Sequence, residues 1–68
     1  MTERELALIV AWYQAGTVKG AAERIGVAEQ TAKNMLLTAR LRAGVRTNVE
    51  LVAANLDRVL ERAGYPAS

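Results

Sequence analysis

Cationic side chains gather in one part of the sequence, between residues 27 and 46. That stretch contains Lys33, Arg40, Arg42 and Arg46, and no acidic residue lies between positions 30 and 49. Side chains of this kind can contact the phosphates of nucleic acids. The net charge of the 68 residues is only +2, which is too small to attract nucleic acid by itself. The placement of the charges is therefore the informative quantity.

Catalysis and metal binding lack their usual residues. The sequence contains neither Cys nor His, so the common nucleophile, acid/base group and zinc ligands are missing. The acidic residues fall on exposed helix faces or at helix starts, where capping explains them better than catalysis. We expect no enzyme activity, no catalytic residue, no metal site and no cofactor.

Nothing in the sequence points to a membrane. No apolar run approaches the roughly 18 residues that a membrane span needs. The first residues, "MTERELALIV", place acids where a signal peptide requires positive charge. These features predict a soluble, cytoplasmic protein.

The composition predicts that helices carry these cationic side chains, because Ala, Leu, Arg and Glu dominate the sequence and aromatic residues are few. Glycines and capping residues predict four helices, from Thr2 to Ala15, from Thr17 to Ile25, from Glu29 to Ala43 and from Thr47 to Ala63. Thr2 with Glu5 and Thr47 with Glu50 have the capping-box spacing. We therefore predict one all-α domain over residues 1–64, followed by a flexible tail at 65–68.

Apolar spacing assigns a buried face to each long helix. In the first helix the predicted core residues are Leu6, Leu8, Ile9, Val10, Trp12 and Tyr13. In the third they are Ala32, Met35, Leu36, Ala39 and Ala43, so that Gln30, Lys33, Asn34, Leu37 and Leu41 project elsewhere. In the fourth they are Val49, Val52, Leu56, Val59, Leu60 and Ala63.

The second and third predicted helices have small residues where they would meet, namely Gly20, Ala21, Ala22 and Ala32. A short helix, a tight turn containing Gly26 and a longer helix form the helix-turn-helix arrangement. The same spacing also fits an ordinary Ala-rich bundle in which Gly26 merely ends a helix. Spacing alone does not choose between them.

Three segments of the sequence, taken together, are more specific evidence than the helix spacing. "TEREL", "AAERIGVAEQTAKN" and "ARLRAGVRTNVELVA" together resemble the DNA-binding domain of the LuxR/GerE family of bacterial transcription regulators. The resemblance covers residues 2–53 without a gap. The matching residues are Thr2, Arg4, Glu5, Ala22, Ile25, Val27, Thr31, Lys33, Val45, Glu50 and Val52.

The resemblance implies a four-helix domain whose third helix enters the DNA major groove and whose fourth helix makes a dimer contact. It implies base contacts from Gln30, Lys33, Asn34 and Leu37. It implies phosphate contacts from Thr17, Thr31, Thr38, Arg40, Arg42, Arg46 and Asn48. The candidate dimer contacts are the residues that lie off the predicted core stripe of the fourth helix, namely Leu51, Ala54, Asn55 and Arg58.

The residue types suit these roles. Lys can donate to guanine, Asn can pair with adenine, and Leu can contact the methyl group of thymine. For each Arg the alternative is a solvated surface charge. The chain also departs from the family pattern, with Gly20 where Glu is usual, Ala28 in place of a capping Ser, Met35 in place of His, and Asn48 in place of Arg.

Two functions remain open. The first is a sequence-specific, DNA-binding transcriptional regulator that acts as a homodimer. The second is a protein-interaction module on the same fold, which binds a component of the transcription machinery through exposed apolar side chains, namely Leu37, Leu41, Trp12 or Leu51.

Overall fold

The structure is a computed structural model that describes residues 1–65. Within this range the chain forms α1 (Glu3–Ala15), α2 (Val18–Ile25), α3 (Glu29–Ala43), α4 (Asn48–Ala54) and α5 (Leu56–Arg62), and no strand. The prediction of an all-α fold is confirmed. Of the predicted flexible tail, only Tyr65 is described, and its backbone N–H donates to the Leu60 carbonyl oxygen at 2.9 Å. Residues 66–68 lie outside the described part of the chain.

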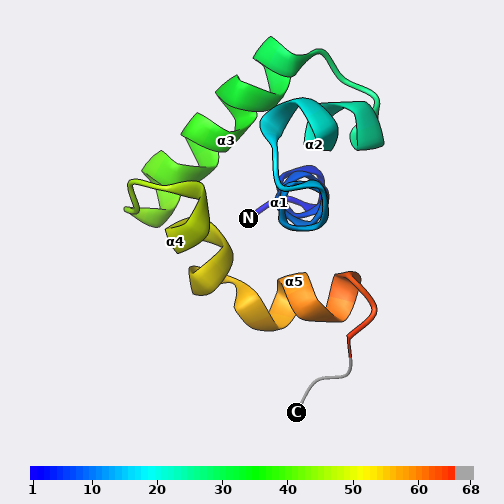
Figure 1. Cartoon of the computed structure of the whole chain (residues 1–68). Coiled ribbons are helices and arrows are strands. Elements are labelled where there is room, and N and C mark those ends of the chain that lie inside the picture. Colours follow the sequence, from blue (N-terminus) through cyan, green and yellow to red (C-terminus); the bar gives the residue numbers. More distant parts are fainter. Residues whose placement is uncertain (66–68) are drawn as a thin grey trace.

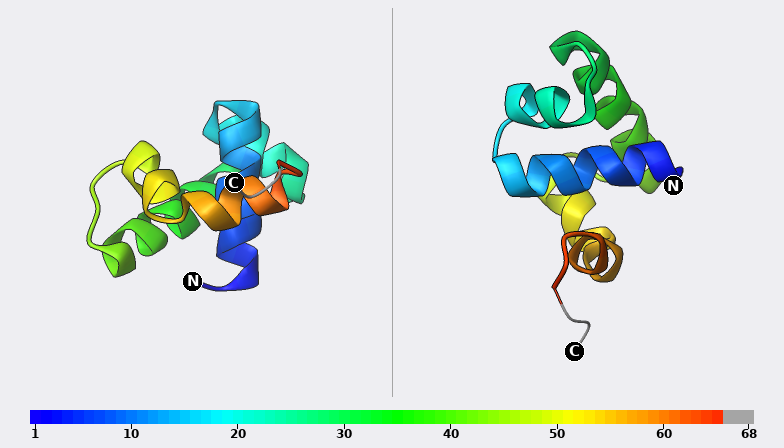
Figure 2. Two further views of the ribbon diagram at one scale, coloured as in Figure 1. Left: turned by 90° about the horizontal axis from the view of Figure 1, so that it is seen from below. Right: turned by 90° about the vertical axis from the view of Figure 1, so that its right-hand side faces the viewer.

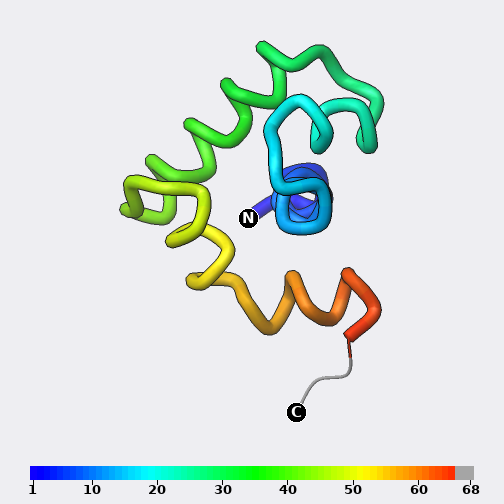
Figure 3. Tube along the Cα trace, viewed as in Figure 1, coloured from blue at the N-terminus to red at the C-terminus, as the bar shows by residue number. Residues whose placement is uncertain are grey.

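Helix α1 lies at the centre of the fold and contacts each of the other four helices. Figure 1 shows it end on, with α2 and α3 above it, α4 to the left and α5 below; Figure 3 follows the same path as a tube. Leu8 and Ile9 of α1 are almost completely buried, as predicted. Tyr13 is 41% exposed instead, against prediction.

Local capping explains where α1 begins. The Thr2 backbone N–H donates to Glu5 Oε1 at 2.9 Å, and the Glu5 backbone N–H donates to Thr2 Oγ1 at 3.1 Å. This reciprocal pair is the predicted capping box. At α4 only half of the second predicted box forms, because the Thr47 hydroxyl, rather than its backbone N–H, donates to Glu50 Oε1.

Helices α2 and α3 are joined by a short turn over residues 26–28. Gly26 has a φ of 75°, a left-handed conformation that glycine adopts without strain. Ala21, Ala22 and Ala32 are buried, as the small-residue pattern predicts. Gly20 does not face α3, against prediction: a Cβ on it would lie 3.0 Å from the Ala15 Cβ of α1 and would meet no atom of α3 within 4 Å. This glycine therefore permits the close approach of α2 to α1.

The predicted helix from Thr47 to Ala63 is broken in two at Asn55. This residue has φ −124° and ψ 25°, outside the helical region. Its side-chain amide donates to the Leu51 carbonyl oxygen at 3.0 Å, so the side chain takes an acceptor of the helical backbone. The chain consequently changes direction between α4 and α5 (Figure 1).

The break changes which side chains face the core. Val52 and Val59 are buried as predicted, but Val49 is 67% exposed and Leu56 is 43% exposed, against prediction. Leu51, which the single-helix pattern left outside the core, is fully buried. One straight helix would carry one apolar stripe, whereas two helices at an angle present different faces to α1.

Candidate nucleic-acid interface

Helix α3 is fixed on the fold by a narrow buried face. Ala32, Leu36 and Ala39 are buried and Met35 is half-buried, which confirms most of the predicted arc. Ala43 is exposed, against prediction. It is the last residue of α3, and Gly44 follows it in a left-handed conformation with φ 72°, so the chain turns away there.

The opposite face of α3 points outward, and Figure 1 shows no other helix beyond it. A hollow of about 360 Å³, which we call the α3 hollow, lies along the side of α3 between its buried and outward faces and is bounded by Val18 of α2 and Asn48 of α4. Its lining consists of Val18, Gln30, Lys33, Asn34, Leu36, Leu37, Arg40 and Asn48. The structure thus brings all four predicted base contacts together with two of the predicted phosphate contacts.

The polar groups of the α3 hollow interact with their neighbours on the same helix. Gln30 Nε2 donates to Asn34 Oδ1 at 3.2 Å. Lys33 Nζ lies 3.5 Å from a carboxylate oxygen of Glu29, and both side chains are about half exposed. These contacts are at the surface, so a ligand can replace them.

Arg40 is held at the edge of the hollow by Asn48, the first residue of α4. Its Nη1 donates to the Asn48 side-chain oxygen. Within residues 1–65 no carboxylate lies within 4 Å of the Arg40 guanidinium, so its charge is not neutralised by an ion pair. Asn48 is one of the predicted phosphate contacts, and no local sequence pattern indicates that its side chain binds Arg40.

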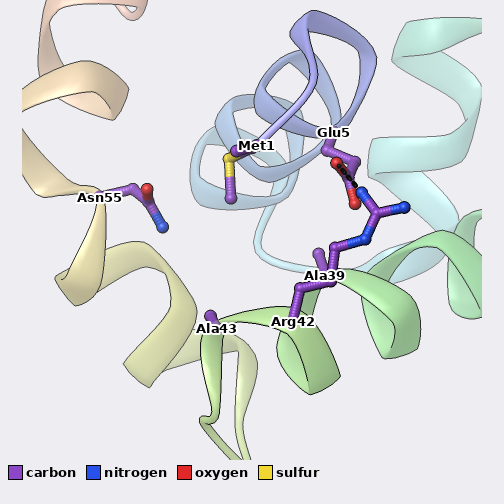
Figure 4. A pocket seen from close by; sticks show the side chains of 6 residues that line it. All are labelled: Met1, Glu5, Ala39, Arg42, Ala43 and Asn55. Atoms are coloured by element: carbon purple, nitrogen blue, oxygen red, sulfur yellow. Dashed lines mark hydrogen bonds and ion pairs between the residues drawn. The ribbon is translucent and has the colours of Figure 1, made fainter.

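Arg42, also a predicted phosphate contact, is not among the residues that line the α3 hollow. Its Nη1 donates to Glu5 Oε1 at 2.9 Å, and Figure 4 shows this pair beside a second hollow near the start of α1. That hollow has a volume of about 220 Å³ and is lined by Met1, Glu5, Ala39, Arg42, Ala43 and Asn55. The pair joins residues 37 positions apart, so no local pattern could predict it.

The pKa of Glu5 lies below its ordinary value of 4.5. The main cause is the hydrogen bond from the Thr2 backbone N–H, and the Thr2 hydroxyl and the positive charge of Arg42 act in the same direction. Burial opposes them by raising the pKa. Glu5 is therefore ionised at neutral pH and joins the start of α1 to the end of α3.

The remaining predicted phosphate contacts do not line the α3 hollow. Thr31, Thr38 and Arg46 are exposed on α3 and on the turn that follows it. Thr17 caps α2, where its hydroxyl accepts from the Gly20 backbone N–H at 3.0 Å. Thr17 therefore has a structural role as the N-cap of α2, and this role does not require nucleic acid.

Three of the four predicted dimer contacts share one surface. Ala54, Asn55 and Arg58 line a hollow of about 450 Å³ together with Met1, Ala53, Leu56 and Asp57. We call this the α4–α5 surface. Leu51 is fully buried, so its assignment as a dimer contact is wrong in this fold, because its side chain packs inside the domain.

The apolar residues predicted to bind a protein partner also differ in their exposure. Leu37 is 48% exposed and Leu41 is 73% exposed. Trp12 is only partly exposed and packs against the core, while Leu51 is buried. The expectation that Leu51 would present apolar surface to a partner is therefore wrong, whereas the part of Trp12 that stays exposed leaves its assignment a prediction.

Within residues 1–65, none of the five helices combines the length and the apolar composition that spanning a membrane requires. Among residues 1–65 there is also no group of three or more acidic, His or Cys side chains that could hold a metal ion. Comparisons with protein-family models, with curated proteins and with solved structures found no match to this chain.

Proposed function

We propose that the chain is a sequence-specific DNA-binding domain of a transcription regulator, in which α2 and α3 act as a helix-turn-helix of the LuxR/GerE type. Helix α3 enters the major groove with its outward face. The observation that carries this proposal is the α3 hollow, where Gln30, Lys33, Asn34 and Leu37 lie beside Arg40.

The dimensions and charges of α3 suit this role. Its 15 residues give a rod of roughly 22 Å at about 1.5 Å per residue, and the major groove admits one helix. Lys33 would leave Glu29 to reach a guanine. An exposed pair of this spacing contributes about 0.3–0.5 kcal/mol, whereas a good base contact contributes about 1–3 kcal/mol. The base contact therefore prevails.

Asn34 is already oriented by Gln30. Its side-chain oxygen has two lone pairs, so it can accept from Gln30 Nε2 and from adenine N6 at the same time. Its amide then donates to adenine N7, which completes the paired contact. Arg40, held by Asn48, supplies a phosphate contact at the edge of the groove.

The proposal includes a homodimer formed through the α4–α5 surface. Two copies related by a dyad would place their α3 helices on half-sites about 34 Å apart. The exposed residues Ala54 and Arg58 supply this contact together with Leu56.

Selection of bound sequences from random duplex DNA tests this function. It should be run at a low and a moderate salt concentration, because phosphate contacts weaken with salt. We expect enrichment of a palindromic motif that becomes more stringent at the higher concentration. Failure to enrich any motif at either concentration would contradict the proposal.

The exposure of Leu37 and Leu41 supports a second candidate, in which the same face binds a protein of the transcription machinery. Leu37→Lys separates the two. It adds a positive charge in the α3 hollow, so DNA affinity is retained or raised if DNA is the ligand. If a protein is the ligand, loss of the apolar contact abolishes binding.

A further inference from the structure

Leu37 is an apolar side chain among the polar and cationic groups of the α3 hollow. It is about half exposed to solvent, and the lining around it includes Lys33, Asn34 and Arg40. No acidic residue of the described chain lines this hollow. The surroundings of Leu37 therefore favour an anionic ligand, whereas the leucine itself is stabilised only by an apolar group on that ligand.

The exposed part of Leu37 is accessible from outside the bundle. The α3 hollow is lined by residues of α2, α3 and α4. Helix α5 lies on the opposite side of α1 from α2 and α3, as the right-hand view of Figure 2 shows. A ligand that approaches the hollow therefore meets Leu37 without displacing α5.

The spacing along α3 determines which base pair Leu37 faces. The proposed function, on which this inference rests, places α3 in the major groove. Leu37 follows Asn34 by three residues, or about 4.5 Å along the helix, and successive base pairs are about 3.4 Å apart. Leu37 thus faces a base pair one or two steps from the pair that Asn34 reads.

The base edges in the major groove present one methyl group, which is attached to C5 of thymine. The other groups there are mainly hydrogen-bond donors and acceptors, and an apolar side chain that covers them leaves them without partners. 5-Methylcytosine carries a methyl group at the same ring position as thymine. From the exposure of Leu37 and the charges around it, we infer that Leu37 binds the C5 methyl group of a pyrimidine.

This contact makes the affinity for DNA depend on cytosine methylation. Leu37 binds the methyl group and uses none of the donors and acceptors that distinguish an A·T pair from a G·C pair. It therefore binds thymine and 5-methylcytosine alike. Methylation of a cytosine at this step strengthens binding, which adds a form of regulation to the proposed function.

Four duplexes test the inference by affinity titration. They differ at one position of one half-site, which holds thymine, uracil, 5-methylcytosine or cytosine with the matching base opposite. The position is found by replacing each thymine of the selected half-site by uracil in turn. Thymine differs from uracil by one methyl group, and 5-methylcytosine differs from cytosine in the same way. We expect the methylated member of each pair to bind about fourfold more tightly, as for one buried methyl group.

Leu37→Ala should abolish this difference, so that both members of each pair bind equally well. Leu41→Ala is the matched control, because Leu41 is exposed on the same helix but does not line the α3 hollow. It should retain the fourfold difference. The difference should also be the same at low and moderate salt, because the methyl group adds no phosphate contact. Retention of the helical circular-dichroism signal shows that both variants are folded.

Specific binding that is unaffected by uracil at every thymine of the half-site would overturn this inference alone. A Leu37→Ala variant with the full methyl dependence would overturn it as well, and so would a dependence that only Leu41→Ala removes. Failure to select any DNA motif contradicts the proposed function itself, and this inference with it. The two failures are therefore distinguished by whether a motif is selected.

Discussion

Arg40 and Arg42 lie two residues apart on α3, but their guanidinium groups have different partners. Arg40 donates to a neutral amide oxygen at the edge of the α3 hollow. Arg42 donates to the carboxylate of Glu5, which neutralises its charge. At the scale of single residues, a cationic side chain is thus available to a phosphate only where no carboxylate of the folded protein pairs with it.

This contrast predicts different effects of two similar variants. Arg40→Ala should reduce the slope of log affinity against log salt by about 0.9, which corresponds to one phosphate contact. Arg42→Ala should leave that slope unchanged. Because the Arg42 side chain is 62% exposed, the Arg42→Ala substitution should lower the free energy of unfolding by only about 0.5–1 kcal/mol. DNA titrations at several salt concentrations and thermal unfolding measure the two effects, and the opposite pattern would contradict the assignment.

Glu5 predicts a pH dependence of stability. Its pKa in the folded protein is lower than 4.5, so the folded state favours the ionised form. Its contribution to stability is complete above the unfolded-state pKa and is lost as the pH falls through the folded-state value. The free energy of unfolding should therefore fall below about pH 4.5.

Glu5→Gln should reduce this acid-induced loss, because the glutamine does not titrate. Glu23→Gln is the matched control, since Glu23 is exposed on α2 and its carboxylate makes no hydrogen bond or ion pair within residues 1–65. Chemical denaturation at a series of pH values measures both variants. Identical pH profiles for Glu5→Gln and the control would show that Glu5 does not carry the effect.

At the scale of the elements, α3 begins without a side-chain cap. Ala28 has the extended backbone conformation of an N-cap residue, with φ −67° and ψ 149°, but no side-chain oxygen to accept from the first turn. Ala28→Ser should supply that acceptor and stabilise the domain by about 1 kcal/mol. The unfolding temperature should rise by roughly 4–8 °C. Ala28→Val is a suitable control, and an equal rise in that variant would exclude capping as the cause.

The elements that the sequence predicted are those with local signals. Thr2 with Glu5 determines the start of α1, and the left-handed Gly26 and Gly44 end α2 and α3 near the expected residues. The break at Asn55 was not predicted, because the apolar pattern continues through it and Asn is tolerated in a helix at small cost. The candidate interface was likewise predicted only where local signals determine it. The helical period placed Gln30, Lys33, Asn34 and Leu37 on the outward face, but the pairing of Arg42 with Glu5 depends on the packing of α3 against α1.

At the scale of the whole molecule, the α4–α5 surface leads to a prediction about assembly. Ala54 is exposed, so Ala54→Glu should preserve the fold and weaken the proposed homodimer, because it would place like charges opposite each other across the proposed dyad. Leu51→Ala should instead destabilise the domain by about 2–5 kcal/mol, because it leaves a cavity in the core. Circular dichroism and sedimentation on operator DNA distinguish the two variants. An Ala54→Glu variant that dimerises normally would exclude this surface as the interface.

The α3 hollow and the α4–α5 surface lie on different parts of a domain with a radius of gyration of 11.0 Å. No residue lines both of them. In the proposed function, DNA reading and dimerisation therefore use separate residues, and a variant of one surface should leave the other intact.

The most direct test of the account is the ratio of affinities for a selected duplex and for a scrambled duplex of the same composition. Lys33→Ala/Asn34→Ala should reduce this ratio by at least tenfold, because each base contact contributes about 1–3 kcal/mol, while the helical circular-dichroism signal is retained. Arg24→Gln removes the same charge outside the α3 hollow and should leave the ratio unchanged. A double variant that is folded and discriminates between the duplexes as well as the original protein does would contradict the proposal that the outward face of α3 reads DNA.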